Sequence, residues 1–461
     1  MDGNPGTVAS KAASKARPKP LLSVGDGIFL TVGMIIGALI FKAPSTVAGA
    51  TSGPLQFLLA WLLGGAISLC GALVYAELAA RHPDTGGEYV FLTRGFGPGV
   101  AFLFAWSRMT VIQTGAIAAV AFVFGDYATE IFSLGKHSSA MWAAFAVAAL
   151  TLLNVAGTLQ SKALQKVMET VLIAGLVAFA VAALVVGGAP RTEPAAAGGG
   201  SFGFAMIFVL LAYGGWNEAA YLTGEVRDGR RNMMRILVVG VVAVTGLYLL
   251  VNLGYLAVLG HAGIKDSKAV AADVMRAIAG EKGALLLALI VCISVLTTVN
   301  AAIFTGGRTN YALGRDFAVF ARLGEWRDLG STPANALVLQ GAIALALVAI
   351  GSTTPDGFNA MVAYTSPVFW TFFLLTGLTL FRFRAQDGSG RGGEGFRVPL
   401  YPVIPMAFCL TCAYMLYSSV NYVRNPEYGP KFGYAVLAGL VIMAAGFPVY
   451  WLTKKNQTKN A

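Results

Sequence analysis

The sequence is poor in charge for its length. Of its 461 residues, 12% are charged and 56% are hydrophobic, whereas soluble globular domains carry about 25% charged residues. Apolar runs of 18 residues or more recur along the chain, and such runs predict membrane-spanning helices. The composition therefore excludes an ordinary soluble protein, and we predict an all-α polytopic membrane protein.

The chain also has few of the residues that bind metals or form disulfides. Its four cysteines and three histidines are Cys70, Cys292, Cys409, Cys412, His82, His137 and His261. The cysteines all fall inside apolar runs, where cysteine packs as a small apolar residue. The histidines fall in loops and form no ligand cluster. We therefore expect no metal, no cofactor and no disulfide-linked heavy subunit.

Motifs of membrane enzymes are missing as well. There is no HExxH sequence, no GxSxG in an apolar segment and no phosphate-cradling loop, which are patterns that carry hydrolytic or phosphoryl chemistry. We therefore expect a protein that is not an enzyme.

Lysine and arginine are distributed unevenly between alternate loops. Twelve apolar segments can be drawn, so both termini lie on one side of the membrane. The loops and tails of that side hold 23 of the 33 Lys and Arg residues, and the opposite loops hold eight. By the positive-inside rule both termini are cytoplasmic, and we expect a multi-pass protein of the plasma (inner) membrane. The net charge of +11 then reflects topology and gives no reason to expect nucleic acid as a partner.

These segments are residues 22–50, 54–80, 98–127, 140–158, 164–188, 202–223, 233–260, 283–313, 334–351, 358–382, 400–423 and 432–453. Residues 1–20 are polar and rich in small residues, which predicts a disordered tail rather than a cleaved signal peptide. Two loops predict short helices, one around residues 88–92 and an amphipathic one at residues 267–279.

Glycine interrupts the first and the sixth apolar segments. The first contains Gly33-Met-Ile-Ile-Gly37 followed by Pro44, and the sixth contains Tyr213-Gly-Gly-Trp216. Glycine weakens a helix by roughly 1 kcal/mol relative to alanine, and freed backbone groups inside a membrane need protein, ligand or water as partners. Paired interrupted segments in the two halves of a chain indicate a binding site.

The two breaks offer complementary backbone groups. The first would expose N–H groups near Gly37, Ala38 and Leu39, which attract an anion. The second would expose carbonyl groups near Leu211, Ala212 and Gly214, which suit an ammonium group. One ligand that carries both charges is an α-amino acid. For the glycines, close helix packing is the alternative.

The spacing of the breaks predicts a repeat. Because they lie five segments apart, each repeat has an odd number of helices, and the second must insert with inverted topology. The predicted domains are residues 1–20, a tail; 21–188, a five-helix repeat; 202–382, an inverted five-helix repeat; 399–453, helices eleven and twelve; and 454–461, a cytoplasmic tail.

Three sequence motifs resemble those of one family. Residues 33–45 (GMIIGALIFKAPS) resemble the first helix of amino acid–polyamine–organocation (APC) transporters, residues 83–98 resemble their first cytoplasmic loop, and residues 213–232 resemble the sixth helix of the L-type amino acid transporter branch. The end of the eighth helix, with Asn300 and residues 305–308, is also similar. The resemblance implies the leucine-transporter fold, alternating access, and an amino acid bound between helices one and six.

Carried over by position, the resemblance assigns the substrate site. Ile35, Gly37 and Ala38 would contact the carboxylate, and Leu211 and Gly214 the amine. The chain departs from the family at three places. Ala38-Leu39 replaces Ser-Gly, Leu211 replaces an aromatic gate, and Leu172 replaces a fifth-helix lysine.

The sequence is compatible with either Na⁺ or H⁺ as the coupling ion. Sodium-coupled relatives use eighth-helix hydroxyls, and Thr297 and Thr298 lie there. The alternative is that both threonines bond to their own helix.

Ionisable residues inside apolar segments are costly and are candidates for a function, and four of them stand out. Glu77 is expected to be solvated or to brace a loop, Arg108 to need an internal partner, and Glu169 to form a cytoplasmic gate pair. Glu218 has two alternatives: pairing with Arg108, or facing the pocket, where it would bind a cationic side chain or a proton.

The predicted function is secondary active transport of L-amino acids, with neutral substrates leading. Transport of cationic amino acids or polyamines through Glu218 is the alternative, and a membrane amino acid sensor is a remote one. The predicted partners are a small-molecule amino acid and the lipid bilayer.

Overall fold

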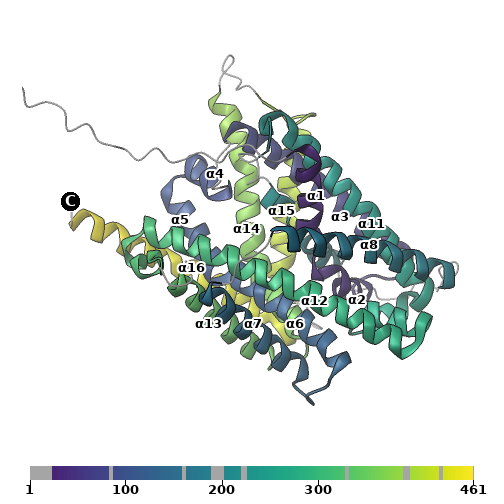
Figure 1. The fold of residues 1–461 in the computed structure, drawn as a ribbon. Helices are drawn as coiled ribbons and strands as arrows, with labels where there is room; N and C mark the ends of the chain where they lie inside the picture. Colours follow the sequence, from purple (N-terminus) through teal and green to yellow (C-terminus); the bar gives the residue numbers. More distant parts are fainter. Residues whose placement is uncertain are drawn as a thin grey trace, which may run out of the picture.

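A computed structural model describes residues 23–82, 87–157, 162–187, 202–219, 226–327, 332–387, 395–424 and 429–459. Within these ranges the regular elements are helices, and isolated bridge residues occur at Val226 and at the paired Arg327 and Thr332. Ten helices there are long and apolar enough to cross a membrane. Together with two interrupted helices they match the twelve predicted segments, which confirms the all-α polytopic fold class (Figure 1).

The long helices have the following bounds. They are α3 (Pro54–Arg81), α5 (Pro98–Ser107) continuing through the π-helical turn η2 (Arg108–Ile112) into α6 (Gln113–Ile131), α7 (Ser138–Ala156), α8 (Lys162–Gly187), α11 (Gly229–Asp266), α12 (Val270–Asp316), α13 (Ala334–Gly351), α14 (Gly357–Gln386), α15 (Val403–Asn421) and α16 (Gly429–Lys459). Shorter elements are α4 (Gly87–Phe96), η4 (Ala318–Gly324) and η6 (Tyr422–Arg424).

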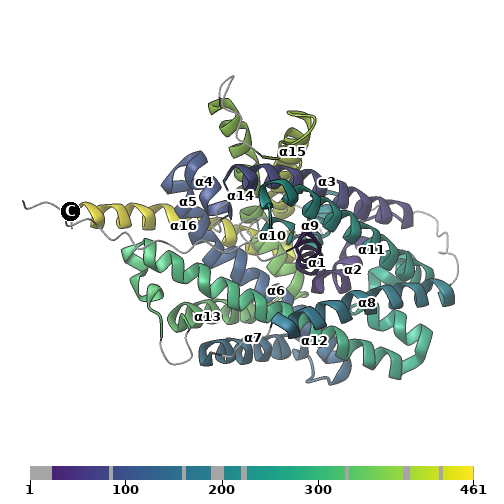
Figure 2. The same cartoon turned by 45° about the horizontal axis from the view of Figure 1, so that its top comes forward.

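Both predicted interruptions are present. The first segment divides into α1 (Val24–Ile35), η1 (Ala38–Phe41) and α2 (Ala43–Gly49), and the sixth into α9 (Phe202–Ala212) and α10 (Trp216–Ala219). These pieces lie in the middle of the bundle, with α3 and α11 on one side and α6 and α12 on the other (Figure 2). The breaks are therefore enclosed by scaffold helices, while α15 and α16 pack at the edge against α14.

The two predicted short helices are also found. Residues 88–92 lie in α4. The amphipathic stretch begins α12, with Val270 and Val274 buried, and Gly280 at φ +68° separates it from the long apolar part.

Two sides of the molecule are distinguished below. We call one side the Arg81 side, where α1 begins and α3 and α14 end. The ends of α3 and α14 meet there, because Arg81 pairs with Asp387 at 2.5 Å. The Lys42 side is where α2, α3 and α14 begin, since Lys42 pairs with Asp356.

Glu77 connects three elements on the Arg81 side. Its carboxylate pairs with Arg81 on its own helix and Arg384 on α14, and accepts the backbone N–H of Val398 at 2.7 Å. Its side chain is fully buried. The loop-bracing prediction is therefore correct and the solvated alternative is wrong, because these donors replace water around the carboxylate.

The two broken helices meet at Gly215. This residue has φ +109°, and a Cβ built there would lie 2.3 Å from the backbone oxygen of Met34. Only glycine tolerates both the left-handed backbone and so close an approach. The end of α1 therefore contacts the turn between α9 and α10 backbone to backbone.

Candidate functional site

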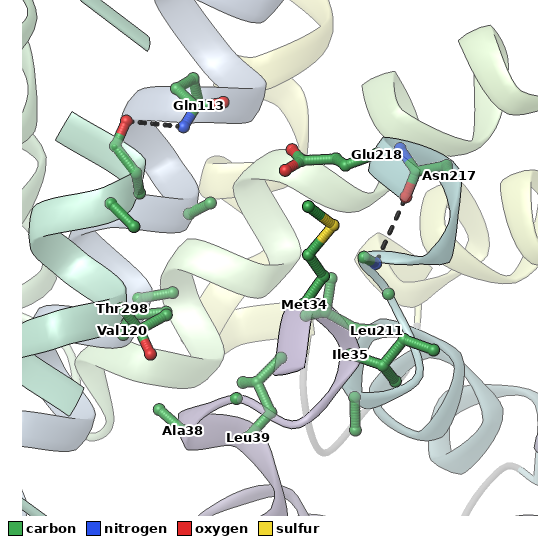
Figure 3. Close-up of a pocket in the computed structure, with 18 of the residues that line it drawn as sticks. Met34, Ile35, Ala38, Leu39, Gln113, Val120, Leu211, Asn217, Glu218 and Thr298 are labelled. Carbon is green, nitrogen blue, oxygen red and sulfur yellow. Dashed lines mark hydrogen bonds between the residues drawn. The ribbon is translucent and has the colours of Figure 1, made fainter. Parts of the chain in front are cut away.

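A cavity of about 520 Å³ lies between the breaks, α6, α12 and α14. Its lining includes every predicted substrate and ion residue: Ile35, Gly37, Ala38, Leu39, Leu211, Ala212, Gly214, Glu218, Thr297 and Thr298. Figure 3 shows Ala38 and Leu39 at one end, Glu218 at the other and Met34 between them. The sequence thus identified residues that the fold brings to one place, and their roles stay predictions.

The first break leaves the start of a helical turn at the cavity wall. Ile36 still donates its N–H to Val32, but Gly37 is extended (φ −118°, ψ −170°) and a new turn starts at Ala38. The first N–H groups of a helical turn have no acceptor on their own helix. Donors near Ala38 and Leu39 are therefore placed where the anion was predicted.

The second break leaves carbonyl groups at the same cavity. The Leu211 carbonyl accepts the N–H of Gly214 at 3.0 Å, and the Ala212 carbonyl lies 3.0 Å from the hydroxyl of Tyr248. Each carbonyl oxygen has a second lone pair. The predicted acceptors are therefore partly engaged by the protein, which fixes their directions.

Tyr248 joins the two breaks. Its hydroxyl lies 3.0 Å from the carbonyl oxygen of Ile35, at the end of α1, and equally far from that of Ala212, at the end of α9. The sequence analysis missed this residue. A tyrosine inside an apolar segment usually has a hydrogen-bond partner when buried, and that signal could have found it.

At the Arg81 end of the cavity, Arg108 lies between two carboxylates. It is 3.6 Å from Glu88 on α4 and 3.5 Å from Glu218 on α10. We call these three residues the Arg108 cluster. Both alternatives for Glu218 describe part of its position, because it pairs with Arg108 and also lines the cavity, with 44% of its side chain exposed.

A second cluster closes the Lys42 side. The Lys42 ammonium lies 2.8 Å from Asp126 on α6 and 3.5 Å from Asp356 at the start of α14, and its side chain is 5% exposed. We call these three residues the Lys42 cluster. Here too the sequence analysis missed the site, although a lysine inside the first apolar segment was a signal for it.

Tyrosine hydroxyls strengthen this closure. Tyr127 donates to the carbonyl of Phe41 at 3.0 Å, and Tyr255 to that of Ile40 at 3.3 Å. Ile40 and Phe41 are buried, whereas Met34 and Glu218, toward the Arg81 side, are exposed. The cavity is therefore closed toward the Lys42 side.

The threonines have ordinary helical partners. Thr297 donates to the carbonyl of Ile293 at 3.0 Å, and Thr298 to that of Ser294 at 3.3 Å. Both bond to their own helix, as the alternative proposed, while also lining the cavity. A sodium site there stays a prediction, as does the gate role of Glu169, whose side chain lies outside the described residues.

Comparison with known proteins gives a consistent set of relatives. The profile of the family described as "Amino acid permease" matches residues 22–445. The chain is 30% identical to the b(0,+)-type amino acid transporter 1 of Rattus norvegicus, over 93% of this chain and 86% of the relative. It is 26% identical to the serine/threonine exchanger SteT of Bacillus subtilis, over 93% of this chain and 95% of the relative. It is 25% identical to the human cystine/glutamate transporter, over 95% of this chain and 86% of the relative.

Proposed function

The chain belongs to the amino acid permease family, and from this premise we propose that it is a secondary active transporter of L-amino acids, first of all neutral ones. The family and these relatives are transporters, which confirms that the chain is a multi-pass membrane transporter and not an enzyme. The observation that carries the proposal is that both breaks open into one cavity of about 520 Å³.

The cavity suits a zwitterion with an uncharged side chain. Backbone N–H groups near Ala38 would bind the carboxylate, and carbonyl groups of Leu211, Ala212 and Gly214 would bind the ammonium group. Most of the remaining wall is apolar, with Ile207, Phe369 and Trp370 among its residues. An apolar wall with few placed polar groups is typical of sites for small molecules.

Transport would proceed by alternating access. The Lys42 cluster closes one side, and the Arg81 side, which the charge distribution assigns to the cytoplasm, is where Glu218 is exposed. We therefore interpret this structure as a cytoplasm-facing state. Reaching the other state requires the Lys42 side to open and the breaks to close over the substrate.

The coupling ion and partners are part of the proposal. Na⁺ at Thr297 and Thr298 and H⁺ at Glu218 are both considered, and no disulfide-linked heavy subunit is proposed because all four cysteines lie in apolar helices. A basic substrate is the second candidate, since Glu218 lines the cavity.

Uptake and counterflow in proteoliposomes test the proposal. A labelled panel of L-amino acids, with and without sodium and pH gradients, should give saturable uptake of at least one neutral member. Gly214→Val is the negative control, because even a Cβ at this position lies 2.9 Å from the Leu211 oxygen. This variant should remain folded and lose uptake. Absence of uptake and of ligand-induced thermal stabilisation across the whole panel would refute the proposal.

A further inference from the structure

The cavity wall carries an unbalanced charge. Among the described residues that line it, three are charged: Glu88, Arg108 and Glu218. One guanidinium and two carboxylates sum to one negative charge. A zwitterionic amino acid adds no net charge, so the occupied cavity would keep this excess.

The two carboxylates are held very differently. Glu88 is 4% exposed and accepts hydrogen bonds from Tyr75 at 2.9 Å and from Asn217 at 3.2 Å, in addition to its ion pair with Arg108. Fixed donors thus compensate its charge. Glu218 is 44% exposed, and its only ion pair with described residues is the 3.5 Å contact with Arg108. The excess charge therefore resides on Glu218.

The position of Arg108 is also unusual. It begins the π-helical turn η2, where α5 passes into α6. Such single turns of π-helix occur frequently at functional sites, because they displace side chains from the regular helical position. Here the turn supplies the residue that joins Glu88 to Glu218.

Among the described residues that line the cavity, Arg108 is the one cation near Glu218. The groups facing it are Arg108 from η2 and, beyond it, Glu88 from α4. The cavity residues contributed by α1, α12 and α14 are all uncharged among those described. In Figure 3 the carboxylate points away from α10 into the cavity, above Met34.

We infer that Glu218 is a binding subsite for one positive charge, which is carried together with the amino acid. This charge has two sources. A lysine-like or arginine-like substrate brings it on its own side chain, whereas a neutral amino acid is carried with a proton, which adds from solvent to a carboxylate oxygen of Glu218 and leaves to solvent on the other side.

The reason is electrostatic. An uncompensated carboxylate is costly inside a membrane protein when the cavity closes and water leaves. One added positive charge makes the loaded cavity neutral, and unlike charges attract more strongly where water is excluded. A substrate with an acidic side chain would double the excess and is disfavoured. This inference rests on the proposed function.

The first test counts protons on the unmodified protein. Binding of L-leucine, L-serine, L-lysine and L-arginine is measured by calorimetry in two buffers with different ionisation enthalpies. We expect proton uptake with the neutral ligands and none with the basic ones. Equal proton counts for both classes would overturn the inference, while no binding by any ligand in the panel would instead overturn the proposed function.

The second test changes the carboxylate. Glu218→Gln should lower uptake of lysine and arginine at least tenfold relative to neutral amino acids, and should remove the pH dependence of neutral uptake. Glu281→Gln is the matched control, because this carboxylate is 72% exposed on the Lys42 side of α12. If Glu218→Gln leaves both the ratio of basic to neutral amino acid uptake and the pH dependence of neutral uptake unchanged, the inference is overturned. If this variant fails to fold, the proton count on the unmodified protein decides.

Discussion

The Lys42 cluster and the Arg108 cluster carry the same set of charges in different surroundings. Each places one cation between two carboxylates. In the Lys42 cluster the cation lies 2.8 Å from one carboxylate and is 5% exposed, outside the cavity lining. In the Arg108 cluster both distances exceed 3.4 Å, all three residues line the cavity, and the Glu218 side chain is 44% exposed. Tight burial fits a structural closure, and a loosely paired, accessible carboxylate fits a binding group.

Removing the cation of the Lys42 cluster should have the largest effect. Lys42→Met leaves Asp126 and Asp356 without their common partner, and breaking a buried ion pair costs about 3 kcal/mol or more. We expect a lower unfolding temperature and loss of uptake. Lys268→Met, an exposed lysine on the same side, is the control.

Adding Asp126→Asn and Asp356→Asn to Lys42→Met should restore part of the stability, since it removes the unpaired charges. If Lys42→Met is as stable as the unmodified protein, the closure does not depend on this cluster.

The same chemical change in the two clusters should give different results. Asp126→Asn removes the carboxylate nearest Lys42, which also accepts the hydroxyl of Ser139 at 2.6 Å, so we expect destabilisation of about 1–3 kcal/mol. Glu218→Gln should leave the unfolding temperature nearly unchanged. Thermal unfolding in detergent measures both, and equal shifts would remove the distinction between the clusters.

Tyr248→Phe addresses the region between the clusters. It removes the hydroxyl that lies 3.0 Å from carbonyl groups of both breaks. The loss of this hydrogen bonding costs about 1 kcal/mol of free energy. The KM for uptake should rise about fivefold, and the free energy of unfolding should fall by about 1 kcal/mol. Tyr417→Phe, on an exposed surface of α15, is the control. A KM equal to that of the unmodified protein would show that this hydroxyl does not position the breaks.

Thr298→Ala should have the smallest effect. The hydroxyl bonds to the Ser294 carbonyl of its own helix, so its loss should matter only if Na⁺ binds there. Uptake with and without a sodium gradient measures this. In a sodium-driven protein, an unaltered sodium response in this variant would exclude Thr298 as a ligand.

The sequence predicted local features better than distant pairings. The breaks were predictable because glycine affects the backbone at its own position, here at Gly37 and Gly214. The Lys42 cluster was not, since Asp126 and Asp356 lie 230 residues apart at the ends of separate helices. For Glu218 the sequence left two alternatives, and only the position of η2 shows that one side chain can both pair with Arg108 and face the cavity.

The contact at Gly215 has a kinetic consequence. Because the α1 end and the α9–α10 turn approach each other backbone to backbone at Gly215, no side-chain rotation at this contact can take up a displacement between them. A shift of either broken helix must be transmitted to the other. We therefore expect the two to move in a single concerted step, so that spin labels placed on α1 and on α10 would report one common rate constant.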